Sequence, residues 1–346
     1  MSKMFQTHAL DQHEIRSRIA SSLGRKDLAS CARVSQDWND SFTPPIYNSV
    51  NLSEHGPSIE SLKRNGHIIR HMTIYRSFFA KLSSSSAQVQ VVSSVMANSP
   101  LTTLEVCTWM GDSEAQALAE ALKTNSTLAI LDLSQNSIGC SGSQALAEAL
   151  KTNSTLAILN LREDSIGCSR AQALAESLKT NSSLTTLNLV DTEWGDNIGD
   201  IGAQALSDAL KTNSTLTTLE LSMTSIGSNG AQAMADALKT NSTLITMNLR
   251  FNLIRDDGTQ ALSEALKINT TLTTLNLHDN SIGYNGAQAL ADALKTNSTL
   301  TTLSLEYNSI GDNGAQALSE ALKTNNSDHF ELGVQFDWRQ RSSGAL

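Results

Sequence analysis

The chain has 346 residues and a formal net charge of −9 at pH 7. Nucleic-acid phosphates need a basic protein face, so this charge argues against nucleic acid as the main partner. The sequence has no run of about 18 apolar residues, so we expect no membrane span. Residues 1–20 carry scattered charges and no apolar core, so we expect no signal peptide. The four cysteines form no disulfide pattern or CxxC motif, which favours inert thiols in a reducing compartment, in the cytoplasm, the nucleus or both.

The first fifty residues differ in pattern from the rest of the chain. We expect residues 1–9 to be a disordered tail. In residues 10–50, Ile15, Ile19 and Leu23 recur at helical spacing, and Gly24 ends the predicted helix. The apolar residues that follow predict a second and a third short helix and are Leu28, Val34 and Trp38.

Residues 10–50 resemble an F-box, the helical module that docks on the Skp-type adaptor of cullin ubiquitin ligases. The matching residues are Glu14, Ile15, Ile19, Leu23, Asp27, Leu28, Val34, Ser35, Trp38, Pro45, Ile46 and Tyr47. The opening Leu-Pro of the family is Leu10-Asp11 here, which is a departure from the pattern. The resemblance implies that the adaptor contacts Leu10, Ile15, Ile19, Leu23 and Leu28. The alternative is a helical cap that shields the first repeat of the following array from water.

Residues 51–100 are interpreted as a connector with a degenerate first repeat. Residues 68–74 predict a strand and residues 89–96 predict a helix, with a serine run at 83–86 between them. Terminal units of repeat arrays are usually atypical, which favours a degenerate copy here.

From residue 101 to residue 325, a unit of about 28 residues recurs eight times. The first leucines of the copies are Leu101, Leu128, Leu156, Leu184, Leu216, Leu244, Leu272 and Leu300. In the copy that starts at Leu272, Leu275 and Leu277 have strand spacing, and residues 287–294 carry the apolar stripe of a helix. Neither half can bury its apolar face alone, so we expect neighbouring copies to stack.

Recurring polar residues predict further features of each copy. Asn285 and Gln288 resemble a capping box at the start of the helix, and similar pairs recur in most copies. The asparagine after the helix, as in Asn241-Ser-Thr, is formally a glycosylation acceptor, but we expect it to end the helix in the left-handed conformation. The asparagine after the strand, as in Asn280, is expected to bond backbone groups of the turn.

The pattern LxxLxLxxNxIGxxGAQALAxALK resembles the long leucine-rich repeat of ribonuclease inhibitor and of Ran GTPase-activating proteins. The resemblance covers residues 101–325. It implies an α/β leucine-rich-repeat solenoid, a right-handed β-α superhelix with a parallel sheet on its concave face, preceded by the small F-box-like domain. Members of this family bind many different partners, so the repeat type does not identify the partner.

Candidate partner-binding residues lie where the copies differ, at the positions after the second and third strand leucines. Arginine, phenylalanine, tyrosine and methionine are common interface anchors. We therefore expect a protein partner on the concave face, contacted by Arg162, Asp191, Met223, Arg250, Phe251, His278, Glu306 and Tyr307. The alternative is a solvated face on which residues vary freely.

A loop insertion in the Leu184 copy contains Trp194. An aromatic residue in a loop flanked by glycine is a candidate contact residue, so Trp194 joins the predicted partner-binding set. The alternative is that this side chain folds onto the neighbouring copy.

The repeat stops after residue 325, and residues 326–346 predict a capping strand and a tail. Apolar residues alternate with polar or small ones at Phe330, Leu332, Val334, Phe336 and Trp338. We expect this strand to cover the open end of the last copy, because an exposed end would risk aggregation.

The sequence has no P-loop, HExxH or GxSxG motif, so we expect no catalytic site, no cofactor and no metal. The predicted function is that of an F-box and leucine-rich-repeat substrate receptor, with the Skp-type adaptor on the N-terminal helices and a protein substrate on the concave face. Two alternatives stay open. One is an activator or regulator of a Ran-type small GTPase, and the other is a non-catalytic scaffold or inhibitor whose first residues are only a cap.

Overall fold

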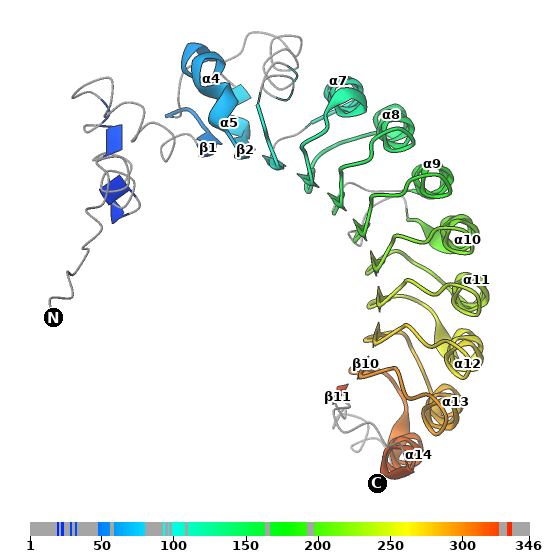
Figure 1. The fold of residues 1–346 in the computed structure, drawn as a ribbon. Helices are drawn as coiled ribbons and strands as arrows, with labels where there is room; N and C mark the ends of the chain where they lie inside the picture. Colours follow the sequence, from blue (N-terminus) through cyan, green and yellow to red (C-terminus); the bar gives the residue numbers. More distant parts are fainter. Residues whose placement is uncertain are drawn as a thin grey trace, which may run out of the picture. The chain divides into compact units, whose positions relative to one another are not determined.

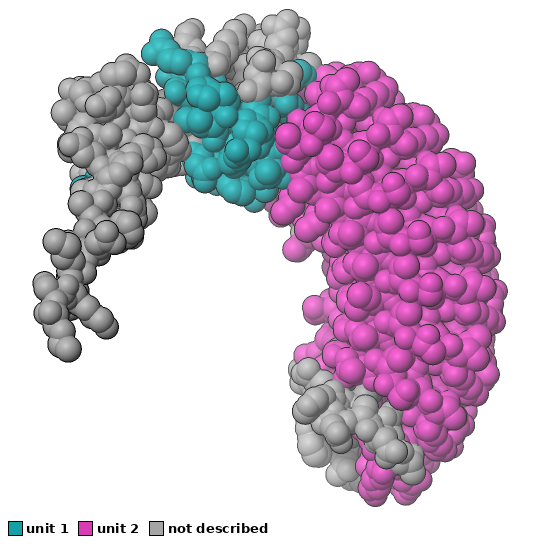
Figure 2. Space-filling view, viewed as in Figure 1, with its two compact units in different colours: residues 1–105 teal, residues 106–346 magenta. Residues whose placement is uncertain are grey.

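The computed structural model describes residues 48–55, 59–79, 99–107, 110–162, 167–191, 197–324 and 331–333, and single residues 19, 20, 22, 23, 28, 29, 32, 93 and 96. The chain forms two compact units, residues 1–105 and residues 106–346, which are coloured separately in Figure 2. In the described part of the chain, eleven strands follow one another in chain order in one sheet.

In the first unit, two parallel strands are joined through a short helix. Strand β1 (Ser49–Leu52) pairs with β2 (His71–Tyr75), and helix α4 (Ile59–Asn65) lies between them in the chain. The strand predicted over residues 68–74 begins later, at His71, because η1 (Gly66–Ile68) is a 3-10 helix. Helix α5 (Arg76–Phe79) follows β2. Of the helix predicted over residues 89–96, only Ser93 and Met96 are described, and both are helical.

In the second unit, strands and helices alternate from copy to copy. After β3 (Thr103–Cys107), the strands are β4 (Ile130–Asp132), β5 (Ile158–Asn160), β6 (Thr186–Asn188), β7 (Thr218–Glu220), β8 (Thr246–Asn248), β9 (Thr274–Asn276), β10 (Thr302–Ser304) and β11 (Glu331–Gly333). The helices are α7 (Asp112–Thr124), α8 (Cys140–Leu150), α9 (Cys168–Leu178), α10 (Gly199–Leu210), α11 (Ser228–Leu238), α12 (Arg255–Leu266), α13 (Tyr284–Leu294) and α14 (Gly311–Thr324). Figure 1 shows the strands of this unit on the inner side of its curve and the helices on the outer side. The predicted α/β solenoid with a parallel sheet on its concave face is confirmed.

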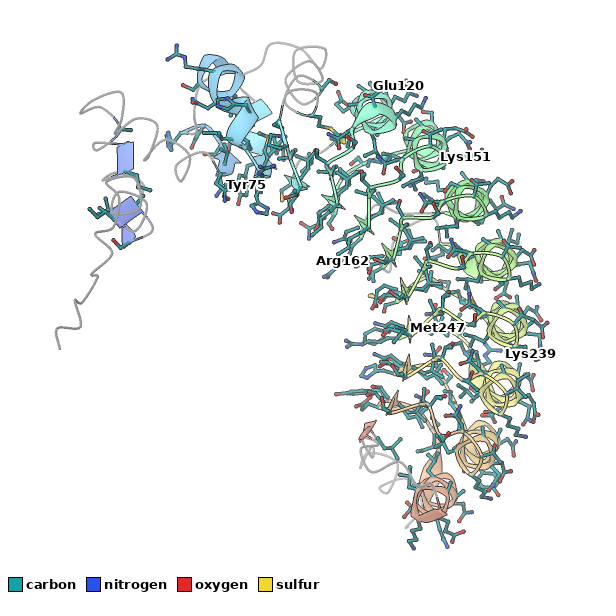
Figure 3. All side chains as sticks on the ribbon, in the orientation of Figure 1. Tyr75, Glu120, Lys151, Arg162, Lys239 and Met247 are labelled. Carbon is teal, nitrogen blue, oxygen red and sulfur yellow. The ribbon has the colours of Figure 1, made fainter. Side chains whose placement is uncertain are left out.

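The core of this unit is a layer of leucines between the strands and the helices. Leu275 and Leu277 of one copy and Leu290 of its helix are each 0% exposed. In β8 a methionine takes the strand position, and Met247 is also 0% exposed (Figure 3). Each such side chain contributes roughly 1.5–3 kcal/mol by its burial. Parallel pairing puts the same position of successive copies side by side, as in Leu275 and Leu303, so the layer is continuous.

The asparagine after the strand bonds the turn backbone, as predicted. Asn252 donates through Nδ2 to Leu221 O and to Leu249 O, both at 2.9 Å, and its Oδ1 accepts from Ile226 N at 2.9 Å. Two of these three bonds reach the preceding copy. This side chain, which is 5% exposed, therefore connects adjacent copies in the interior.

The prediction for the asparagine after the helix is wrong in its backbone conformation. Asn125 has φ −73, and no asparagine in this position is among the described residues with positive φ. Instead, Asn241 accepts from Thr243 N and Leu244 N and donates to Leu210 O of the preceding copy at 2.8 Å. Its side chain is 6% exposed. A glycan could not reach this buried and hydrogen-bonded amide nitrogen without unfolding the turn.

The predicted capping box is also wrong. Asn285 lies inside α13, whose N-cap residue is Gly283. The first backbone N–H groups are satisfied by the preceding copy, because Gly283 N and Gly286 N donate to Asp256 Oδ1 at 2.6 and 3.0 Å. Gln288 bonds forward to Asp292 in the same helix. The Asp256 carboxylate thus caps the N-terminus of α13 in the next copy, where negative charge is favourable.

Strand β11 is the described part of the C-terminal segment. Leu332 pairs in parallel with Leu303, and Leu305 N donates to Gly333 O at 2.7 Å. The segment therefore adds a strand to the sheet next to β10. The other predicted strand positions, Phe330, Val334, Phe336 and Trp338, lie outside the described residues.

Candidate functional site

The loop after each strand has a fixed geometry in most copies. We call the two residues that follow the third strand leucine the exit loop, such as His278-Asp279 after Leu277. The strand-end asparagine turns the chain, because Asn276 Oδ1 accepts from His278 N at 3.0 Å. The second exit-loop residue is then left-handed, with φ 50 at Asp279 and φ 58 at Tyr307. L-residues rarely adopt this conformation, and it costs roughly 1–2 kcal/mol.

Backbone hydrogen bonds between copies hold the exit loops in place. Met223 N donates to Arg250 O at 3.0 Å, Phe251 N donates to His278 O at 2.8 Å, and Asp279 N donates to Glu306 O at 2.9 Å. Each left-handed residue is thereby tied to the first exit-loop residue of the next copy. These bonds offset the strain and fix the direction in which the side chains leave the sheet.

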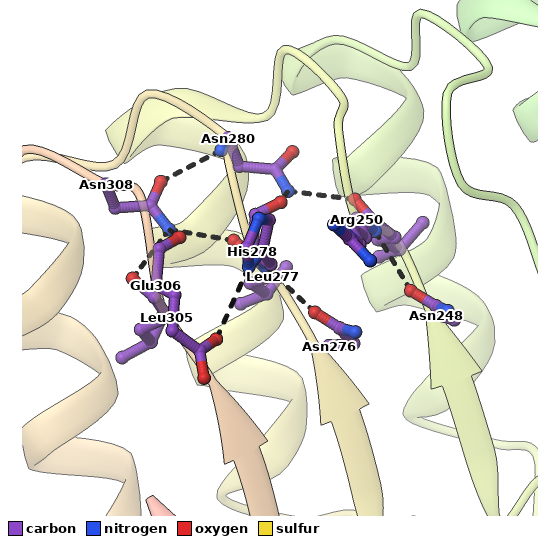
Figure 4. Close-up of polar contacts among 10 residues, drawn as sticks. Asn248, Arg250, Asn276, Leu277, His278, Asn280, Leu305, Glu306 and Asn308 are labelled. Carbon is purple, nitrogen blue, oxygen red and sulfur yellow. Dashed lines mark hydrogen bonds and ion pairs between the residues drawn. The ribbon is translucent and has the colours of Figure 1, made fainter. Parts of the chain in front are cut away.

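The exit loops after β8, β9 and β10 bring five predicted residues together. We call Arg250, Phe251, His278, Glu306 and Tyr307 the aromatic cluster. The Phe251 and His278 rings pack edge to face with centroids 5.1 Å apart, and the His278 and Tyr307 rings lie 4.8 Å apart. The Arg250 guanidinium carbon lies 4.3 Å from the centroid of the Phe251 ring, within cation–π range. His278 Nδ1 lies 3.5 Å from Glu306 Oε2, a contact drawn in Figure 4.

Exposure within the aromatic cluster is uneven. Tyr307 is open to solvent, with 60% of the residue exposed, and Arg250 is exposed as well. The His278 side chain is 13% exposed and that of Glu306 is 29% exposed. His278 is therefore the centre of the cluster, and its neighbours present their surfaces to solvent.

Next to the cluster, Glu220 ends strand β7 in a half-buried position. Burial raises the pKa of Glu220, and a hydrogen bond from the Asn248 side chain opposes that shift. The register of the sheet places Glu220 beside Asn248, which in turn is beside Asn276. A partly desolvated carboxylate thus lies on the strand face that leads to the aromatic cluster.

The remaining predicted partner-binding residues do not join the cluster. Arg162 is exposed on the strand side of the unit (Figure 3). Met223 is half-buried in the exit loop after β7. Asp191 contradicts the prediction of an accessible side chain, because it is 2% exposed. Its φ is not positive, unlike that of Met223 in the same position. Trp194 lies outside the described residues.

The predicted adaptor-binding residues are described only in part. Leu10 and Ile15 lie outside the described residues. Ile19 is 42% exposed, whereas Leu28 is 4% exposed and packs with Ala20, Leu23 and Ala32. The side chain of Leu28 therefore belongs to the interior of the helical block.

Sequence reasoning did not include Asp279 among the site residues. It occupies the same position as Phe251 and Tyr307 in the copy between them, and it is half-exposed. The sequence could have indicated Asp279, because the residue at this position varies from copy to copy. The inward strand-end residues, such as Asn248 and Asn276, are turn residues whose amide oxygens accept backbone N–H groups (Figure 4).

The described residues meet neither the requirements of a metal site nor those of a membrane-spanning helix. Among them, no group of three or more His, Cys, Asp or Glu side chains could hold a metal ion. No helix in the described part of the chain is long and apolar enough to cross a membrane. Cys107, Cys140 and Cys168 are free thiols.

Comparison with known proteins identifies the repeat. Residues 124–147, 212–235, 269–291 and 296–319 match the family model described as Leucine Rich repeat. Each segment begins at the end of a helix or in the turn after it and runs through a strand into the following helix. The chain therefore contains leucine-rich repeats, which in this structure form an open α/β solenoid. No curated protein sequence matches the chain.

Two solved structures match part of the chain. One is described as the leiomodin-1 actin-binding site 2, with 28% identity, a TM-score of 0.38, and coverage of 44% of this chain and 86% of that chain. The other is the tropomodulin C-terminal domain of Caenorhabditis elegans, with 15% identity, a TM-score of 0.39, and coverage of 45% of this chain and 92% of that chain. Each alignment spans less than half of this chain.

Proposed function

We propose that this chain is a non-catalytic binding protein that holds a protein partner on the concave face of its repeats, at the aromatic cluster. Solenoids present extended concave surfaces of this kind to their partners. The observation that carries the proposal is the grouping of Arg250, Phe251 and Tyr307 around His278 in three consecutive copies. Tyrosine and arginine are among the residue types that contribute most at protein interfaces.

The cluster is organised before any partner binds. Its rings already contact one another, and the backbone of each exit loop is bonded to the next copy. Ordering a mobile side chain on binding costs about 0.5–1.5 kcal/mol. Side chains that are held in place beforehand avoid part of that cost, which favours binding at this cluster.

We further propose that residues 10–50 dock on a Skp-type adaptor, so that the chain acts as a substrate receptor of a cullin-type ubiquitin ligase. The support is the F-box resemblance together with the exposure of Ile19 beside the packed Ala20 and Leu28. In this arrangement other subunits perform ubiquitin transfer, and this chain contributes proximity.

The concave-face proposal is tested by retention of proteins from a cell extract on the immobilised chain. We compare the intact chain with the double variant Arg250→Ala, Tyr307→Ala and with the outer-face double variant Lys151→Ala, Lys239→Ala. The expected result is a set of proteins that only the cluster variant loses. Equal retention by the intact chain and the cluster variant would exclude the aromatic cluster as the binding surface.

The adaptor proposal is tested separately with a purified Skp-type adaptor and the full chain. Binding is expected, with loss on Ile19→Asp and little change on Ser22→Asp, an exposed position in the same helical segment. Absence of binding by the intact chain would remove the ubiquitin-ligase assignment and leave the concave-face proposal standing.

A further inference from the structure

We propose that the partner segment bound at the aromatic cluster is positively charged, with a lysine or arginine side chain placed against the Tyr307 ring between the carboxylates of Asp279 and Glu306. This inference rests on the proposed concave-face function and specifies the chemistry of its partner.

The three residues lie next to one another in two adjacent copies. Asp279 N donates to Glu306 O at 2.9 Å, so these two residues are adjacent across two copies. Tyr307 follows Glu306 in the chain and occupies in its copy the position that Asp279 occupies in the preceding one, with φ 58 and 50 respectively. The two residues therefore have the same backbone conformation, and they occupy equivalent positions in adjacent copies.

The charge of this region is negative. Across the strand ends and exit loops of β7 to β10, the carboxylates are Glu220, Asp279 and Glu306, and Arg250 is the cationic side chain. The Arg250 guanidinium is already placed over the Phe251 ring at 4.3 Å. Among the described residues no ion pair joins it to Asp279 or Glu306, and a positive group from a partner would complement the surface.

On the outer face, carboxylates pair with lysines of the same helix. Asp236 pairs with Lys239 and Asp292 pairs with Lys295, each at 2.7 Å, and five other copies repeat this arrangement. On the inner face, within the described residues, no lysine or arginine forms an ion pair with Asp279 or Glu306. The charged contact of Glu306 there is with His278 Nδ1 at 3.5 Å.

The Tyr307 ring adds a second reason to expect a cation. It is 60% exposed and contacts the His278 ring, so much of its surface is open to a partner. A cation over a tyrosine ring is attracted by the negative face of the ring, and more so where carboxylates stand beside it. An anionic partner would meet Asp279 and Glu306, and a second copy of this chain would bring a net charge of −9.

The test measures binding of short peptides to the full chain by isothermal titration calorimetry at low salt. The probes are an alternating arginine-glycine hexapeptide and its glutamate-glycine counterpart. The cluster variant is Asp279→Asn, Glu306→Gln, in which asparagine tolerates the left-handed backbone. The matched control is Asp236→Asn, Asp292→Asn, which removes the same charge from the outer face. Tyr307→Leu removes the ring and keeps the charge.

We expect the basic peptide to bind and the acidic peptide not to bind. The cluster variant should bind the basic peptide about tenfold more weakly, and Tyr307→Leu several-fold more weakly. The outer-face control should stay within about twofold of the intact chain, because its carboxylates lie on the outer helices, where each is already paired with a lysine. Circular dichroism of each variant checks that the fold is retained.

Three results would overturn the inference. They are no binding of the basic peptide, tighter binding of the acidic peptide, and equal weakening by the cluster and outer-face variants, which would mean an effect of net charge alone. Its failure is distinguishable from failure of the proposed function. If proteins retained from the extract are lost with Arg250→Ala, Tyr307→Ala but not with Asp279→Asn, Glu306→Gln, the concave face binds a partner whose contact segment is not basic.

Discussion

Replacing Asn241 by alanine tests the idea that buried asparagines tie successive copies together. Asn241 makes short bonds to Leu210 O and from Leu244 N, both at 2.8 Å, and longer bonds at 3.3 and 3.1 Å to Asn213 O and from Thr243 N. The side chain is 6% exposed, so water does not readily replace it. Leaving one buried polar group without its partner costs about 1–3 kcal/mol, so losing the two short bonds predicts a loss of about 2–6 kcal/mol.

The matched control is Asn125→Ala at the same position of an earlier copy. Asn125 is half-exposed, and its Oδ1 accepts from Leu128 N at 2.8 Å and from the exposed Thr127 N at 3.1 Å. Water can substitute for part of these bonds, so we expect a loss of about 1–2 kcal/mol. Asn241→Asp provides a second comparison, because its carboxylate would face carbonyl acceptors and should destabilise more at neutral pH than after protonation.

The assay is urea unfolding followed by circular dichroism, with the slope of each transition compared as a check on cooperativity. The reasoning predicts that Asn241→Ala loses at least about 1 kcal/mol more than Asn125→Ala. Equal losses for the two variants would refute it, because the deeper burial of Asn241 would then contribute nothing.

The remaining predictions concern backbone strain, a raised pKa and the outer surface. Ser281 is exposed with φ 55, so Ser281→Gly should raise the free energy of unfolding by about 0.5–1 kcal/mol in urea titrations, and a decrease would contradict the assigned strain. Burial raises the pKa of Glu220 above its ordinary value of 4.5, so the folded state disfavours the charged form above that pH. Glu220→Gln should therefore increase the urea midpoint at pH 7 and much less at about pH 3.5, below both pKa values; an equal gain at the two pH values would be inconsistent with this cause. Lys239→Ala removes the exposed pair with Asp236 and should cost less than about 0.5 kcal/mol in thermal unfolding, whereas a loss above about 1 kcal/mol would show that this pair matters more than surface pairs normally do.

The leucine periodicity was sufficient to predict the solenoid. Leu275 and Leu277 at strand spacing and Leu290 on a helical stripe can all be buried only if neighbouring copies stack, and all three are buried. The role of Asn280 also followed from its position, since a buried turn cannot leave its backbone groups unpaired. These are properties of one copy and of identical neighbours, which a repeated sequence displays directly.

Features that depend on contacts between different positions of adjacent copies could not be predicted. Asp256 caps the helix of the next copy, so pattern matching within one helix pointed to the wrong residues. The five members of the aromatic cluster were each predicted from variation. Their contact was not, because the left-handed turn at Phe251 and Tyr307 decides where the rings lie relative to His278.

The most direct test of the account is photo-cross-linking from the concave face. A benzoyl-phenylalanine placed at position 307 keeps an aromatic L-residue at the left-handed site, and the same group at position 239 on the outer helix face serves as the control. The account predicts a protein adduct from position 307 that is lost with Arg250→Ala and is absent from position 239. Adducts that form equally from both positions, or only from position 239, would contradict the assignment of the concave face as the binding surface.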